Sequence, residues 1–131
     1  MDGSAKVLID SSVWIDFFRG TEPAASAMRT VIQTKRVVVC GQIKQEVLQG
    51  SRDRRAFQKL AREMSLWEYE SETPDDFIDA ARIFSELRWK GITIPPSNCL
   101  IAALCKRTSL PLYTYDPDFD SIPDLVRFSG P

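Results

Sequence analysis

The sequence predicts a single α/β domain with a mostly parallel central sheet of four to five strands flanked by helices. Short apolar runs rich in β-branched residues alternate with longer segments whose apolar residues recur at helical spacing. Strands that alternate with helices in this way are typical of a parallel sheet. The 131 residues, 44% of them apolar and 27% charged, also suit one globular domain with a single core.

The N-terminal segment opens with a polar lead-in at residues 1–6, which is expected to be disordered. Val7–Ile9 is an apolar run suited to a strand that is buried on both faces. Ser11 or Ser12 is then expected to cap a helix over Val13–Phe18. Together these residues predict a strand that leads directly into a helix.

The next segment predicts two helices that flank a second strand. Thr21 is expected to cap the first helix, whose apolar residues recur at helical spacing as far as Ile32. Val37–Cys40 is the strand, because its residues are almost all β-branched. A helix over Gln42–Gln49 follows, and Gly50 marks its end.

The middle of the chain predicts a helix, a strand and a second helix. Ser51–Met64 carries apolar residues at near-helical spacing, and Leu66–Tyr69 resembles a third strand. Pro74–Lys90 is a longer helix with an apolar stripe and a proline in its first turn. Ile92–Pro96 is expected to be an extended connector, because a residue before proline is disfavoured in the helical region.

The C-terminal segment predicts the remaining elements. Ser97 is expected to cap a helix over Asn98–Arg107 with an apolar face. Leu110–Thr114 is the fourth strand, and Tyr115–Asp120 is an acidic turn that follows it. Val126–Phe128 is a candidate for a last short strand.

The composition excludes several classes of function. The chain has no histidine, which removes histidine general bases, Ser-His-Asp catalysis and nearly all zinc chemistry. Cys40, Cys99 and Cys105 are odd in number and lack paired spacing, so they predict buried thiols rather than disulfides. A reducing, cytoplasmic location fits this cysteine usage.

The charge and the hydropathy exclude other classes. A formal net charge of -1 gives no basic field over the whole molecule, so any nucleic-acid binding must rest on a local patch. No apolar stretch approaches the ~20 residues that a membrane-spanning helix needs, and the first residues do not resemble a secretion signal. No membrane association is therefore expected.

Polar side chains follow the predicted strands where a shared site can form. Asp10 follows the first strand, Glu46 lies on the helix after the second, and Asp116 and Asp118 follow the fourth, while Asn98 begins the preceding helix. The carboxyl ends of parallel strands meet at one edge of a sheet, where ligands bind. Carboxylates gathered there need protons or a cation, and oxygen ligands suit Mg²⁺ or Mn²⁺. Considered one at a time, most aspartate and glutamate residues are solvated or belong to turns. Asp10 is unusual, because it directly follows an apolar strand.

Four segments resemble, in the right order, the motifs of PIN-domain ribonucleases, and especially the VapC-type toxins of toxin–antitoxin pairs. These segments are Val7–Asp16, Gln45–Gly50, Gly91–Ala103 and Leu112–Phe119. The resemblance covers nearly the whole chain and implies one PIN-like domain over residues 1–131. It further implies an endoribonuclease that depends on Mg²⁺ (or Mn²⁺), is held silent by a VapB-type antitoxin, and forms a homodimer.

The resemblance also implies roles for individual residues. Asp10, Glu46 and Asp116 take the family's acidic positions, and Asp118 is an auxiliary ligand. A water activated by the metal would attack an RNA phosphodiester in line. The two serines after Asp10 would form hydrogen bonds near the metal or the phosphate; they are Ser11 and Ser12.

One residue departs from the family's pattern. The third motif normally carries an aspartate where this chain has Asn98, so the core acidic set falls to three carboxylates. The amide keeps a carbonyl oxygen but loses the charge, and we expect weakened metal binding with low or absent cleavage. An alternative is a catalytically silent PIN-fold module that binds a partner protein or RNA. A receiver or phosphatase domain ranks well below, because the residues after Asp10 lack a second early acid.

A basic run is the only local patch dense enough to suggest RNA binding. It comprises Arg52, Arg54, Arg55, Lys59 and Arg62. Acidic residues are interleaved with it, so a solvated helix face is the slightly favoured interpretation.

Aromatic residues next to the first acid have two interpretations. Trp14, Phe17 and Phe18 more often belong to a core or an interface. The resemblance implies that they help to form a groove for a helical segment of the antitoxin.

Overall fold

The computed structural model describes residues 4–131, so the first three residues of the expected lead-in lie outside the described residues. The expected disorder is wrong for the end of that lead-in. Lys6 is the first residue of β1, and the carbonyl oxygen of Ala5 accepts a hydrogen bond from the N–H of Arg36 at 3.0 Å. Pairing with β2 therefore orders these residues.

The predicted parallel sheet is confirmed. Its strands are β1 (Lys6–Ile9), β2 (Arg36–Cys40), β3 (Glu68–Glu70) and β4 (Leu112–Tyr113). They lie in the order β3-β2-β1-β4, and every neighbouring pair is parallel. The expected strand over residues 126–128 is reduced to one parallel bridge between Leu112 and Arg127, because the segment forms only two backbone hydrogen bonds with Leu112.

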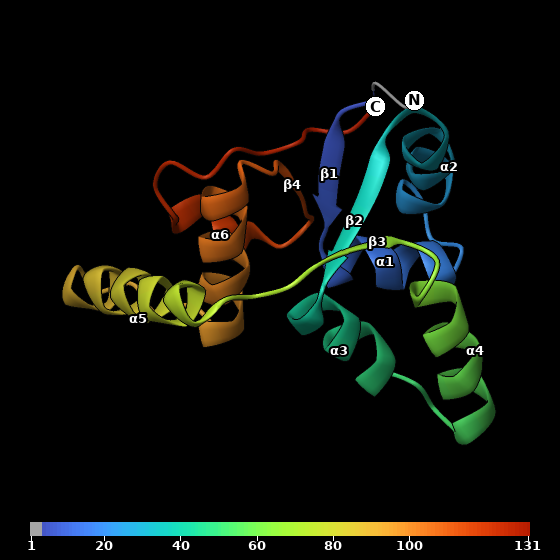
Figure 1. Cartoon of the computed structure of the whole chain (residues 1–131), viewed down its shortest axis with the longest axis horizontal. Coiled ribbons are helices and arrows are strands. Elements are labelled where there is room, and N and C mark those ends of the chain that lie inside the picture. Colours follow the sequence, from blue (N-terminus) through green and yellow to red (C-terminus); the bar gives the residue numbers. More distant parts are fainter. Residues whose placement is uncertain (1–3) are drawn as a thin grey trace.

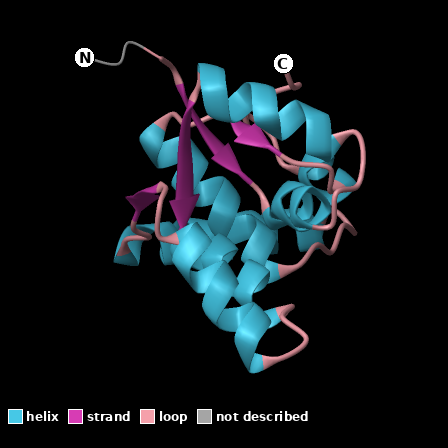
Figure 2. Cartoon of the chain, turned by 90° about the vertical axis from the view of Figure 1, so that its right-hand side faces the viewer, coloured by secondary structure: helices cyan, strands magenta, loops and turns pink. Residues whose placement is uncertain are grey.

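The helices of the described residues enclose this sheet. They are α1 (Ser11–Phe18), α2 (Ala24–Thr34), α3 (Gly41–Gln49), α4 (Arg54–Met64), α5 (Pro74–Trp89), α6 (Pro96–Thr108) and the 3-10 helix η1 (Pro117–Ser121). Figure 1 shows α5 and α6 on one side of β1 and β2, and α1, α2 and α4 on the other. Figure 2 shows the same strands, turned by 90°, among the surrounding helices.

Helix starts are where the structure departs most from the expected elements. Asp10 is the N-cap residue of α1, so Ser11 and Ser12 lie inside the helix and their hydroxyls are available elsewhere. The helix expected from Thr21 begins at Ala24 instead, and Thr21 contributes its carbonyl oxygen rather than a side-chain cap. These serine hydroxyls reach the acidic residues described below.

Prolines explain the start of α6. The extended connector ends at Pro95, and Pro96 is already helical because its fixed φ suits a first helical turn. Ser97 is therefore inside the helix rather than its cap, and Asn98 lies in the first turn. The side chains of Asn98–Cys105 are all buried, and α6 packs against α5, α3 and η1.

The core is continuous from the sheet into the helices. Val7, Leu8 and Ile9 of β1 are at most 1% exposed and belong to the same buried cluster as α6. All three cysteines are free and buried, as the sequence predicts. No helix within residues 4–131 is both long enough and apolar enough to cross a membrane.

Candidate acidic site

Asp10 lies at the carboxyl end of β1 and is only 3% exposed. Its N–H donates to the carbonyl oxygen of Tyr113 at 2.9 Å, which ties it to β4. Its carboxylate oxygen Oδ2 accepts two hydroxyl hydrogen bonds, from Ser12 at 2.8 Å and from Thr114 at 2.7 Å. The strand therefore presents a buried carboxylate that is held by neutral donors.

The electrostatics of Asp10 favour a cation nearby. Burial raises the pKa of its carboxyl group above the ordinary value, and the negative charge of Glu46 raises it further. The hydroxyls of Thr114 and Ser12 lower the pKa but do not cancel the effect of burial. An ionised Asp10 is thus costly in this surrounding unless a positive charge compensates it.

Glu46 is held by two side chains, one on each carboxylate oxygen. Ser11 of α1 donates to Oε1 at 2.7 Å, and Gln42 donates through Nε2 to Oε2 at 2.8 Å. Gln42 lies one turn earlier on α3, which is the spacing at which helical side chains meet. Ser11 and Ser12 therefore reach two different carboxylates from consecutive positions.

Asp116 and Asn98 form the third part of the site. The side-chain amide of Asn98 donates to Oδ2 of Asp116 at 3.1 Å, and the N–H of Asp118 donates to Oδ1 at 2.9 Å. The N–H of Asp116 in turn donates to Oγ1 of Thr114 at 3.0 Å. Asp118 thus contributes its backbone to this arrangement.

The donor set fits a hard dication chemically, because it consists of carboxylate and amide oxygens. The carboxylates are nevertheless paired with neutral hydrogen-bond donors, and in the case of Asp116 this donor is the amide of Asn98. Within residues 4–131, no three or more acidic or cysteine side chains gather into a group able to hold a metal ion. The structure therefore brings the predicted residues to one region as separate hydrogen-bonded groups: Asp10 with Ser12, Glu46 with Ser11, and Asp116 with Asn98.

Two residues of this region were not predicted as members of the site. Thr114 is buried and joins Asp10 to the backbone of Asp116, although the sequence shows it only as the end of an apolar strand. Gln42 had a signal, because it precedes Glu46 by four residues on one helix. Threonine after a strand carries no comparable signal, since its partner Asp10 is distant in sequence.

The basic residues predicted for RNA binding lie on α4 or just before it. Arg52, Arg54, Arg55, Lys59 and Arg62 are exposed. Arg52 pairs with its neighbour Asp53 at 3.7 Å, and no ion pair within the described residues links this run to Asp10, Glu46 or Asp116. The helix packs against α3, which carries Glu46.

The aromatic residues of α1 do not all reach the surface. Trp14 is 0% exposed, and its ring packs on Phe18 at a centroid distance of 5.7 Å and on Trp67 at 5.5 Å. The prediction that Trp14 lines an open groove is therefore wrong for this structure, because its side chain belongs to the core. Phe17 and Phe18 are half-buried at the edge of this cluster.

A small cavity lies beside Phe18. It measures about 150 Å³ and is lined by Ile15, Phe18, Arg19, Val47, Gly50 and Leu60. These residues come from α1 and α3, each with its C-cap residue, and from α4. The cavity is thus a hollow in direct contact with Phe18.

Comparison with known proteins agrees with this architecture. The family model of the PIN domain matches residues 7–125. The ribonuclease VapC11 of Mycobacterium tuberculosis is 35% identical over 129 residues, which cover 95% of this chain and 96% of that protein. Among solved structures, VapBC2 of Rickettsia felis, bound to a DNA fragment from its promoter, matches with a TM-score of 0.79 and 16% identity, covering 94% of this chain and 97% of that chain.

A second solved structure extends the comparison. VapC20 of Mycobacterium tuberculosis, described as a toxin that cleaves the sarcin-ricin loop, matches with a TM-score of 0.72 and 14% identity, covering 95% of this chain and 99% of that chain. At such identities the likeness concerns the fold. The family follows from the domain match and from the full-length relative. This chain belongs to the PIN-domain family, within which it is a relative of the VapC ribonucleases.

Proposed function

We propose that this chain is the endoribonuclease toxin of a toxin–antitoxin pair and that it hydrolyses RNA phosphodiesters with a divalent cation. The observation that carries the proposal is Asp10. It is a buried carboxylate at the end of β1, and its pKa is raised by burial and by Glu46, so a cation bound beside it would stabilise its charge. The full-length relatives are named as ribonucleases, which supports RNA as the substrate.

The residues of the site have separate roles in this proposal. Asp10, Glu46 and Asp116 would hold Mg²⁺ (or Mn²⁺) together with the carbonyl oxygen of Asn98. A dication bound there supplies positive charge to the phosphodiester and lowers the pKa of water. Ser12 and Ser11 keep the carboxylates of Asp10 and Glu46 oriented, as their hydrogen bonds support.

The first experiment measures cleavage of a mixed RNA substrate with Mn²⁺, with Mg²⁺ and after EDTA. It compares the chain as it stands with Asp10→Asn and with Asp120→Asn as a matched control, since Asp120 is an exposed acid paired with Arg127 at 2.7 Å. We expect weak metal-dependent cutting, in keeping with Asn98, that Asp10→Asn removes and Asp120→Asn retains. Cutting that survives both EDTA and Asp10→Asn would contradict the proposal.

Asn98 favours a second candidate function. Because its amide already donates a hydrogen bond to Asp116 at 3.1 Å, that carboxylate has a side-chain partner without a metal. A PIN-fold module that binds a partner protein or RNA without cutting it is consistent with this contact. Titration with Mn²⁺ separates the nuclease from the binding module. The nuclease should bind the ion, whereas a module without catalysis does not need it.

The antitoxin is proposed to dock an amphipathic helical segment beside Phe17 and Phe18, where the cavity of about 150 Å³ offers an apolar hollow. Phe18→Ser should abolish co-purification with a co-expressed VapB-type antitoxin. Val126→Ser is a matched control, because Val126 is 64% exposed and does not line the cavity beside Phe18. Equal loss with both variants would contradict docking at Phe18.

A homodimer and an RNA-binding basic run complete the proposal. Exposed apolar side chains on α5 support a second copy on that helix: Phe77 (56%), Ile78 (66%) and Trp89 (75%). Light scattering of Ile78→Lys would then report a monomer.

Charge reversal of Arg54 and Arg55 should weaken RNA binding and reduce its salt dependence. A cytoplasmic location accords with these partners.

A further inference from the structure

Glu72 provides the N-terminal cap of α3 from a distant part of the chain. Its Oε1 accepts the N–H of Gly41 at 3.1 Å, and its Oε2 accepts the N–H of Gln42 at 2.7 Å. The N-cap residue of the helix, Cys40, forms no side-chain cap. The carboxylate therefore satisfies two N–H groups that a helix start leaves unpaired, and it places negative charge at the positive end of the helix.

Gly41 makes room for this carboxylate. A Cβ atom at position 41 would lie 2.9 Å from Oε1 of Glu72 and 2.8 Å from the hydroxyl oxygen of Tyr69. Real side chains do not approach that closely, so any larger residue would displace Glu72, Tyr69 or the helix. The first residue of α3 and the carboxylate are thus fitted to each other.

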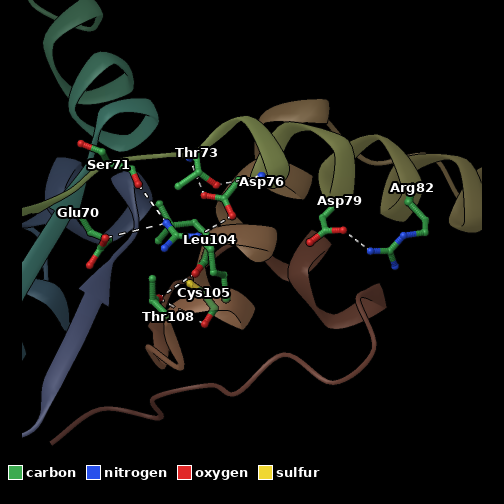
Figure 3. A network of polar contacts seen from close by, with 10 residues as sticks. Glu70, Ser71, Thr73, Asp76, Asp79, Arg82, Leu104, Cys105 and Thr108 are labelled. Carbon is green, nitrogen blue, oxygen red and sulfur yellow. Dashed lines mark hydrogen bonds and ion pairs between the residues drawn. The ribbon is translucent and has the colours of Figure 1, made fainter.

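The segment that carries Glu72 is fixed from its other side by α6. Arg107 donates to the carbonyl oxygen of Ser71 at 3.0 Å and to the buried carboxylate of Asp76 at 2.8 Å. Figure 3 shows Glu70, Ser71, Thr73 and Asp76 converging on this network. Thr73 and Asp76 also form a capping box that fixes the start of α5. The connector over residues 71–73 therefore joins α3 to α6.

We propose that Glu72 is a positioning residue for Glu46, acting through the first turn of α3. Gln42, whose N–H binds Glu72, uses its side chain to hold Oε2 of Glu46 at 2.8 Å. Anchoring this turn fixes the carboxylate of Glu46 relative to Asn98, which α6 carries. The inference rests on the proposed function, because Glu46 needs this placement only if it binds the cation.

The test compares Glu72→Ala and Glu72→Gln with Asp53→Ala. Asp53 is a matched control, because it accepts the N–H of Ala56 at 2.8 Å as the cap of α4, which carries no residue of the acidic site. Three quantities are measured on the full chain: Mn²⁺ affinity, amide exchange at Gly41 and Gln42, and the ¹³C signal of the Glu46 carboxyl group. Thermal unfolding reports any general loss of structure.

We expect Glu72→Ala to speed amide exchange at Gly41 and Gln42 by about tenfold or more, to move the Glu46 signal and to weaken Mn²⁺ binding severalfold. Glu72→Gln keeps one acceptor oxygen and should give intermediate values, which also serves if the alanine variant unfolds. Asp53→Ala should lower the unfolding temperature while leaving the Glu46 signal and Mn²⁺ affinity unchanged.

The outcomes separate the two proposals. If the unaltered chain and Asn98→Asp both bind no Mn²⁺, the proposed function fails, while the Glu46 signal still decides the role of Glu72. A Glu46 signal that moves only in the Glu72 variants supports positioning. A signal that is the same in Glu72→Ala and in the unaltered chain overturns it, whatever the unfolding temperatures are.

Discussion

Asn98 donates its side-chain amide to Oδ2 of Asp116 at 3.1 Å, so a neutral residue satisfies one of the carboxylates of the acidic site. Asn98 is itself buried, at the start of α6. An aspartate at the same place would set two carboxylates at hydrogen-bond distance with no donor between them. Like charges at such a distance destabilise each other unless a proton or a cation intervenes.

Asn98→Asp should therefore make the fold depend on the metal. We expect the variant to unfold at a lower temperature than the unaltered chain in EDTA and to gain more stability from Mn²⁺. A ligand at a hundredfold excess over its Kd stabilises by about 2.7 kcal/mol. Thermal unfolding with and without Mn²⁺ measures both effects. Asn98→Leu is the control, since it removes the amide without adding a ligand, and an equal response of the two variants would count against the idea.

Thr114→Val should impair the site while keeping the shape of the side chain. The hydroxyl of Thr114 donates to Asp10 at 2.7 Å and accepts the N–H of Asp116 at 3.0 Å, so valine leaves a buried carboxylate and a half-buried N–H without this partner. The expected loss in the free energy of unfolding is about 1–3 kcal/mol, with weaker Mn²⁺ binding. Denaturant unfolding and Mn²⁺ titration test this. Thr114→Ser keeps the hydroxyl and should therefore retain both the free energy of unfolding and the Mn²⁺ affinity. A serine variant as impaired as the valine variant would show that the methyl group of Thr114 matters more than its hydroxyl.

The parallel sheet and the positions of the acids after its strands were predictable, because both follow from local patterns. Val7–Ile9 and Val37–Cys40 are β-branched runs, and an acid directly after the first of them stands out in the sequence. The carboxyl ends of parallel strands then meet at one edge, which relates Asp10 to Asp116 without knowledge of the fold.

The supporting contacts were not predictable, because they join residues that are far apart in sequence. Thr114 reaches Asp10, and Glu72 caps a helix that begins at Gly41. Helix starts were misjudged for a related reason. Ser12 and Ser97 are good capping residues in isolation, but the fold uses Asp10 and Pro95 at those positions and leaves the serines inside the helices.

Asp76 and Arg107 should give the protein a loss of stability in acid. Burial tends to raise the pKa of the Asp76 carboxyl group, but the hydrogen bond from Arg107 and the N–H of Thr73 outweigh it and lower the pKa below 3.8. Because the pKa of Asp76 is lower in the folded state than in the unfolded state, the pair stabilises the fold fully at pH values above the pKa of the unfolded state. This contribution is lost as the pH falls through the pKa of the folded state.

The difference in unfolding free energy between the unaltered chain and Asp76→Asn should thus be constant near neutral pH and shrink below about pH 4. Denaturant unfolding at several pH values measures it. Asp79→Asn is the control, because Asp79 pairs with Arg82 in an exposed position, where a pair contributes about 0–1 kcal/mol. A difference for Asp76→Asn that grows toward low pH would contradict the assignment.

Trp14 offers a test that separates core packing from partner binding. Its indole N–H is buried and has no hydrogen-bond partner among the described residues, so Trp14→Phe removes an unsatisfied donor along with some apolar area. We expect that variant to lose less than about 1.5 kcal/mol, whereas Trp14→Ala should lose about 3–5 kcal/mol through the cavity it leaves. Denaturant unfolding distinguishes the two.

The same pair of variants sharpens the proposal for the antitoxin groove. Phe18 stacks on Trp14 at a centroid distance of 5.7 Å, so Trp14→Ala should disturb Phe18 and lower both stability and partner capture. Trp14→Phe keeps an aromatic support and should keep partner capture. If Trp14→Phe folds stably but loses the partner, the indole itself must contact the antitoxin, and the buried ring seen here must move to the surface when the complex forms.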